Sequence, residues 1–111
     1  MNLKISTNEV LESRRLVLML SMSISIALKE GAIDIEEAEN LLFSPYTQFK
    51  LREIGIEEEI IKIINLGCEL ENVKSLIPHA LTDSIDEIFD LSLRKLKELP
   101  NANIPSKKWI D

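Results

Sequence analysis

The stretch Leu16-Val-Leu-Met-Leu-Ser-Met-Ser-Ile-Ser-Ile-Ala-Leu28 decides the fold of this chain. Ten of its thirteen side chains are apolar, and only three serines interrupt it. A helix that crosses a membrane needs about 20 apolar residues, so this stretch is too short and too interrupted for that role. A helix that is apolar almost all round is usually buried. The stretch therefore predicts a first helix with neighbours on nearly every side.

The rest of the composition is that of a small helical domain. The chain has 111 residues, of which 45% are hydrophobic and 29% charged, with only three glycines and four prolines. This length is typical of one domain, and the abundance of Leu, Ile, Glu and Lys favours helix. We therefore predict an all-α, single-domain bundle of about five helices around the central first helix. The domain spans residues 1–111, with an N-terminal arm over 1–6 and a C-terminal tail over 101–111.

Capping residues and glycines mark the expected helix ends. The first helix runs from Thr7 or Asn8 to about Lys29, and residues 69–77 form a short helix or an irregular turn. Two segments carry competing strand signals, because residues 21–26 alternate in polarity and residues 60–64 are rich in isoleucine. The helical interpretation is favoured for both. Further helices are predicted to start at Asp34, Ser44, Glu57 and the capping segment 82–84, where Ser84 has capping-box spacing to Glu87. The predicted helix-ending glycines are Gly31, Gly55 and Gly67.

The sequence offers little chemistry for a catalytic or metal site. One cysteine and one histidine cannot supply the four ligands of a structural zinc ion, and neither a paired Glu-x-x-His motif nor an Asp-rich calcium loop is present. Cys68 and His79 could form a nucleophilic pair, but a half-buried thiol and a surface histidine are the simpler interpretation. We expect no catalytic, cofactor-binding or metal-binding residue. A small enzyme using carboxylates or this pair is the least favoured alternative.

The acidic residues are the best candidates for a binding surface. The net charge is −6 with a pI near 4.8, which disfavours nucleic acid and anionic membranes and permits a basic protein partner. Each acidic cluster falls at a predicted helix start, where the helix dipole favours negative charge. The functional alternative is that two or more of these first turns face a partner. The candidate partner-binding residues are Asp34, Glu36, Glu37, Glu57, Glu58, Glu59, Asp83, Asp86, Glu87 and Asp90, with Trp109 of the tail as a candidate anchor.

Three segments taken in order resemble a family of small bacterial proteins with no assigned function. They are residues 28–39 (LKEGAIDIEEAE), 42–46 (LFSPY) and 67–78 (GCELENVKSLIP). The resemblance implies a cytoplasmic bacterial protein and brings no catalytic residues, and a single cysteine also fits a reducing compartment. In size, charge and helical character the chain is also similar to immunity proteins, which bind and neutralise toxins.

The leading hypothesis is a non-enzymatic protein-binding module, immunity-like in character, that binds a basic partner through its acidic helix N-termini. The alternative is a structural homo-oligomer, such as a homodimer, in which part of the first or last helix forms the interface.

Overall fold

The computed structural model describes residues 9–100, and every regular element within them is a helix. The all-α prediction is confirmed, and both segments with strand signals are helical. The predicted arm over 1–6, the tail over 101–111 and Trp109 lie outside the described residues. Four helices have nine or more residues, namely α1 (Glu9–Lys29), α3 (Pro45–Glu53), α4 (Glu58–Cys68) and α6 (Leu81–Glu98). Shorter elements are α2 (Ile35–Leu41), α5 (Leu70–Leu76) and the 3₁₀ turn η1 (Pro78–Ala80).

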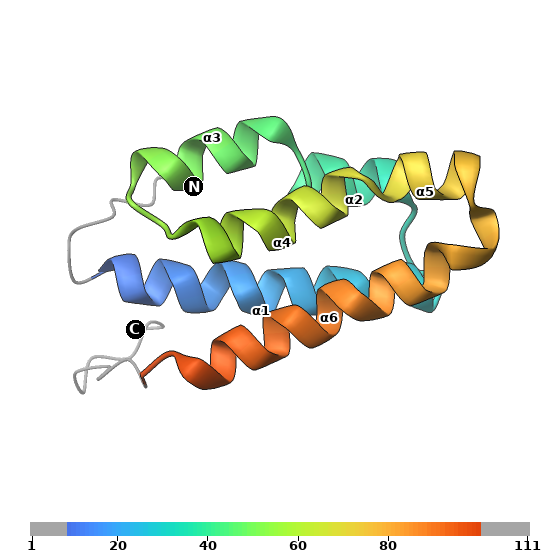
Figure 1. The fold of residues 1–111 in the computed structure, drawn as a ribbon. Coiled ribbons are helices and arrows are strands. Elements are labelled where there is room, and N and C mark those ends of the chain that lie inside the picture. Colours follow the sequence, from blue (N-terminus) through green and yellow to red (C-terminus); the bar gives the residue numbers. More distant parts are fainter. Residues whose placement is uncertain (1–8, 101–111) are drawn as a thin grey trace.

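The long helices α1 and α6 lie side by side and antiparallel, and they form the most extensive helix pair (Figure 1). Helix α4 packs on α6, and α3 packs on α4. The core is almost entirely aliphatic, with one buried aromatic ring, Phe43. Its fully buried members include Leu18, Ala38, Ile60, Ile64, Leu70 and Ile88.

Local sequence explains most helix ends. The Asp34 Oδ1 atom accepts a hydrogen bond from the Glu37 backbone N–H at 2.8 Å, and Ser44 Oγ accepts one from Thr47 N–H at 3.1 Å. These bonds satisfy amides that have no partner inside the helix. Helices α1 and α3 end as predicted at Gly31 and Gly55, whose φ angles of 75° and 86° suit glycine. After each glycine the chain turns back to bond the last helical carbonyls, which is a Schellman motif.

Two predicted helix ends are wrong. Gly67 does not stop a helix but lies inside α4, where a Cβ atom would overlap the Phe43 ring. Its small size therefore serves packing, because the ring occupies the space of a side chain. Ser84 does not cap the last helix, because η1 leads directly into α6, which begins at Leu81. The Ala80 N–H donates to Ile77 O at 2.9 Å, so the turn supplies the start that a side-chain cap would otherwise provide.

The prediction of a central first helix is also wrong, because α1 is buried on one side only. Its inner face carries Leu18 and Ile24 together with Ser21 and Ser25, which are 0% and 1% exposed. On the opposite side Met19 is 49% and Ile26 is 50% exposed. In the described bundle, α1, α4 and α6 pack against one another. One side of α1 faces this contact and its other side is exposed.

Buried serines lie in the contact between α1 and α6. Ser92 of α6 is fully buried and its Oγ lies 3.0 Å from Ser21 Oγ and 2.7 Å from Ile88 O. Ser25 Oγ donates to Ser21 O at 2.8 Å. Each buried hydroxyl can therefore be bonded within the helices, and small side chains let the two backbones approach.

Candidate functional site

The acidic start of α4 is neutralised by cations of the same chain. Glu57 Oε1 lies 2.7 Å from Arg14 Nε of α1, and Glu58 Oε1 lies 3.0 Å from Arg52 Nε of α3. Glu59 Oε2 lies 2.8 Å from Lys95 Nζ of α6. These carboxylates therefore join helices of the bundle to one another, which is a structural role and leaves little charge for a partner.

The pKa shifts at this start agree with its geometry. Burial raises the pKa of Glu57, but its own backbone N–H and the charges of Arg14 and Lys95 outweigh burial and hold this pKa below its ordinary range. The hydrogen bond from Arg52 lowers the pKa of Glu58. The hydrogen bond to Glu59 raises the pKa of Lys95. The lowered pKa values of Glu57 and Glu58 and the raised pKa of Lys95 each favour the charged form that the ion pairs require.

The acidic start of α2 is small and exposed. The carboxylate of Asp34 caps this helix, so its role is structural. Glu36 and Glu37 are exposed, and no cation lies within 4.0 Å of them among the described residues. Two carboxylates in the first turn of a seven-residue helix are what the helix dipole favours.

The acidic start of α6 is different, because its carboxylates extend well beyond the first turn. We call Asp83, Asp86, Glu87 and Asp90 the acidic face of α6. They line one shallow depression together with Leu91 and Arg94. Asp86 Oδ1 lies 2.9 Å from Lys29 Nζ of α1. For the other three, no cation of residues 9–100 lies within 4.0 Å.

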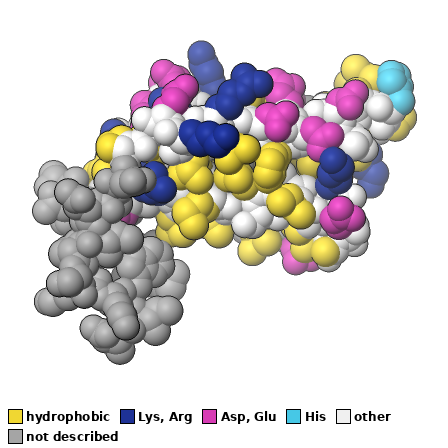
Figure 2. All heavy atoms as spheres, turned by 90° about the horizontal axis from the view of Figure 1, so that it is seen from below, with side chains coloured by type: hydrophobic (Ala, Val, Ile, Leu, Met, Phe, Trp, Pro, Cys, Tyr) yellow, Lys and Arg dark blue, Asp and Glu magenta, His cyan; other side chains and the backbone are white. Residues whose placement is uncertain are grey.

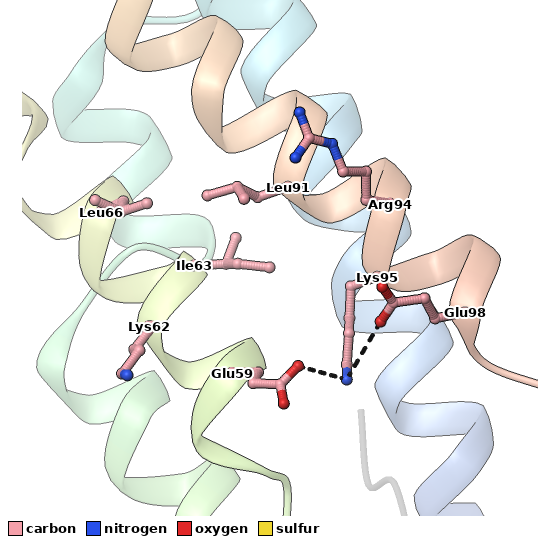
Figure 3. Close-up of a pocket in the computed structure, with 8 residues that line it drawn as sticks. All are labelled: Glu59, Lys62, Ile63, Leu66, Leu91, Arg94, Lys95 and Glu98. Atoms are coloured by element: carbon pink, nitrogen blue, oxygen red, sulfur yellow. Dashed lines mark hydrogen bonds and ion pairs between the residues drawn. The ribbon is translucent and has the colours of Figure 1, made fainter.

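A groove between α4 and α6 lies beside the ion pairs of Lys95 (Figure 3). Its floor is apolar and consists of Ile63, Leu66 and Leu91. Its rim is charged, and Lys95 Nζ joins Glu59 of α4 at 2.8 Å to Glu98 of its own helix at 3.8 Å. The groove is open and both signs of charge occur along it, so it has no preference for a ligand of one charge.

Cys68 and His79 do not have the environment of a catalytic pair. Burial raises the pKa of the Cys68 thiol, so this thiol forms less of the reactive thiolate at neutral pH. Its Sγ lies 3.4 Å from Nε2 of Gln48, an uncharged amide. His79, the single histidine of the sequence, is exposed in η1 at one end of the molecule (Figure 2). Among residues 9–100, no three His, Cys, Asp or Glu side chains gather closely enough to hold a metal ion.

The structure reveals one surface that the sequence did not locate, the exposed side of α1, although the homo-oligomer alternative named part of the first helix as an interface. We call Met19, Met22, Ser23 and Ile26 the outer face of α1. Figure 2 views the bundle from the side of α1 and α6, and shows hydrophobic side chains gathered across it. Ile26 lines a depression between these helices with Phe89 of α6. The uncharged stretch from Leu16 to Leu28 is the sequence feature that indicates such a surface, but it does not show which side of the helix the neighbouring helices cover. None of the described helices is long and apolar enough to span a membrane.

Fold and surface together define a small all-helical protein with an acidic helix face and an apolar helix face. The chain belongs to the family described as "Protein of unknown function (DUF3969)", which it matches over residues 8–111. The predicted resemblance to a family of uncharacterised small proteins is thereby confirmed. No curated protein and no solved structure shows a match to the chain.

Proposed function

We propose that this chain is a non-enzymatic protein-binding module that binds a basic protein partner through the acidic face of α6. One observation carries the proposal, namely the distance of these carboxylates from the helix start. The helix dipole stabilises negative charge only within the first turn. Because α6 begins at Leu81, the dipole accounts for Asp83 but not for Asp86, Glu87 and Asp90 in the second and third turns.

The placement of the acidic face supports the same proposal. Its residues lie on the side of α6 opposite to the buried residues Ile85, Ile88 and Ser92, and only Asp86, at the border of this face, reaches a charged group of α1. Three of its four carboxylates have no cation of residues 9–100 within 4.0 Å, whereas each of the three carboxylates at the start of α4 is paired. A basic partner would gain electrostatic attraction here without breaking the ion pairs that hold α1, α4 and α6 together.

An immunity-type role in the bacterial cytoplasm is the finer form of the proposal. Its support is the small size, acidity and helical character of the chain, and its requirement is that the partner be a toxin. The identity of the bound partner decides between this role and other protein-binding roles.

The test compares two variants of equal charge change. Asp83→Asn, Glu87→Gln and Asp90→Asn together remove three charges from the acidic face of α6. Glu36→Gln, Glu37→Gln and Glu39→Gln remove three from α2 and serve as the control. Each full-length chain is immobilised and used to capture proteins from its native host. The captured partner is then titrated against each chain at about 50–300 mM salt, a range over which the Debye length shortens about 2.4-fold.

We expect a partner with a basic pI whose affinity falls at least tenfold for the α6 variant and with rising salt, while the α2 variant binds normally. Equal binding by both variants, or binding that salt does not weaken, would overturn the proposal. Capture of no partner at all would also count against it.

A further inference from the structure

We propose that the outer face of α1 is a self-association surface on which a second copy of this chain packs antiparallel. This inference is independent of the proposed function, because it rests on another face of the molecule. Met19 and Ile26 are about half exposed, Met22 is partly exposed, and no charged residue occurs from Leu16 to Leu28. Exposed apolar side chains that gather on one helix face, unlike those scattered singly, are typical of an interaction surface.

Charge complementarity indicates a second copy as the occupant. The outer face has its centre midway between Met22 and Ser23. Arg15 and Glu30 border it at its two ends, each 7.5 residues or about 11 Å from that centre. A two-fold axis through the centre therefore places Arg15 of one copy level with Glu30 of the other, twice in each dimer.

Within residues 9–100, neither charge has an ion-pair partner. Arg15 Nη1 approaches Pro100 O at 3.5 Å, which is a long contact with a neutral acceptor. Glu30 is exposed, and no cation lies within 4.0 Å of it among the described residues. Neighbouring Lys29 is already paired with Asp86. Within one chain the two charges are about 22 Å apart along the helix, so they do not pair with each other.

The size of the face sets the expected affinity. Thirteen helical residues span about 20 Å, so this apolar strip is small beside the roughly 800 Å² that each partner buries in a stable complex. Phe89 of α6 extends the apolar area next to Ile26. We therefore expect a reversible dimer with a dissociation constant of about 10–300 μM, above the nanomolar range of large interfaces.

The experiment is sedimentation velocity of the full-length chain from 5 to 500 μM, with a set of four variants. Ile26→Asp places a charge in the outer face, and Phe49→Asp places the same charge at an exposed position on α3 as a control. Arg15→Glu and Glu30→Arg each put like charges together across the two-fold axis. The double variant carrying both exchanges them and restores opposite charges.

We expect the wild-type chain to dimerise reversibly and Ile26→Asp to raise the dissociation constant at least tenfold, with no effect of Phe49→Asp. The single charge variants should each weaken the dimer at least threefold, and the double variant should recover it. Recovery requires antiparallel pairing between two chains, because a merely structural role of either residue would not be rescued by the exchange. A monomer at 500 μM would overturn the proposal and leave the face for another occupant. A dimer that is indifferent to Ile26→Asp would overturn it equally.

Discussion

The inner and outer faces of α1 both mix polar and apolar side chains, although one face is buried and the other is exposed. The inner face, which packs against the bundle, includes the polar residues Ser21 and Ser25. The outer face, which meets solvent in the described structure, includes Met19 and Ile26. Burial on this helix therefore follows side-chain size at the contact as much as polarity, because a hydroxyl bonded to a carbonyl four residues earlier costs little to bury.

The number of apolar side chains on a helix and the side on which they are buried are therefore separate properties. The large number of apolar residues between Leu16 and Leu28 indicates that the helix packs against other helices. The burial depends on which side lets a neighbouring helix approach most closely, and here serines provide that approach. The apolar residues left over on the other side are then available for a contact outside the monomer.

The largest predicted difference between the two faces is in the free energy of unfolding when a charge is placed on each of them. Ile24→Asp should lower the free energy of unfolding by at least about 3 kcal/mol, because Ile24 is 7% exposed and the new charge has no partner. Ile26→Asp should change it by less than about 0.5 kcal/mol. Urea denaturation measures both changes. At a protein concentration of about 2 μM, a dimer as weak as the one proposed above is almost entirely dissociated, so the unfolding of the monomer is observed. Equal losses would show that the two faces are not different.

A second prediction exchanges the serines themselves for leucine. Ser25 and Ser23 both donate a hydrogen bond to the carbonyl four residues earlier, at 2.8 Å and 2.9 Å, but only Ser25 is buried. Ser25→Leu should destabilise the protein by about 1–3 kcal/mol, because the larger side chain overpacks the contact with α6. Ser23→Leu should be neutral or slightly stabilising, since leucine is the better helix former. Thermal unfolding of both variants measures the difference, and a stable Ser25→Leu chain would contradict close packing at this position.

The contact between Gly67 and Phe43 offers a second place where a small residue permits close packing. Gly67→Ala should cost about 1–2 kcal/mol in spite of the helix propensity of alanine, because its Cβ would overlap the buried Phe43 ring. Phe43→Leu makes room, so in that background the same alanine should be neutral or stabilising. A double-mutant cycle by chemical denaturation gives the coupling energy. Additive effects would mean that the glycine is not required for the ring.

The smallest predicted effect tests the charged end of the inner face, where Arg14 meets Glu57. Glu57→Gln should lower stability by about 0.2–1 kcal/mol at pH 7. The folded pKa of Glu57 lies below its unfolded value of about 4.3, so its contribution is present above that pH and is lost as pH falls through the folded pKa. The difference from wild type should therefore shrink as the pH is lowered through the folded pKa of Glu57, as measured by urea titration at each pH. Glu71→Gln, an exposed change on α5, is the control, and a difference independent of pH would contradict the ion-pair role.

Much of the fold could be predicted from the sequence because its signals are local. Asp34, Ser44, Gly31 and Gly55 act within one helical turn, so their roles were legible without tertiary information. Gly67 and Ser84 were misread because distant or intervening structure decides them. Phe43 fills the space beside Gly67, and the η1 turn starts α6 before Ser84 is reached.

The candidate site was predicted only in part, for the same reason. The sequence indicated three acidic helix starts of similar weight. It could not show that Arg14, Arg52 and Lys95 converge on one of them from three other helices. Nor could it show which side of α1 stays exposed, because its apolar residues surround most of the helix.

The hydroxyl contact between Ser92 and Ser21 also determines how α6 is aligned lengthwise against α1. One helical turn to either side of Ser92 along α6, the residues are Ile88 and Leu96. If α6 slid by one turn, about 5.4 Å, a branched side chain would have to fit where two serines now meet. A shift of one turn is therefore sterically unfavourable, and this contact favours a single register between the two helices.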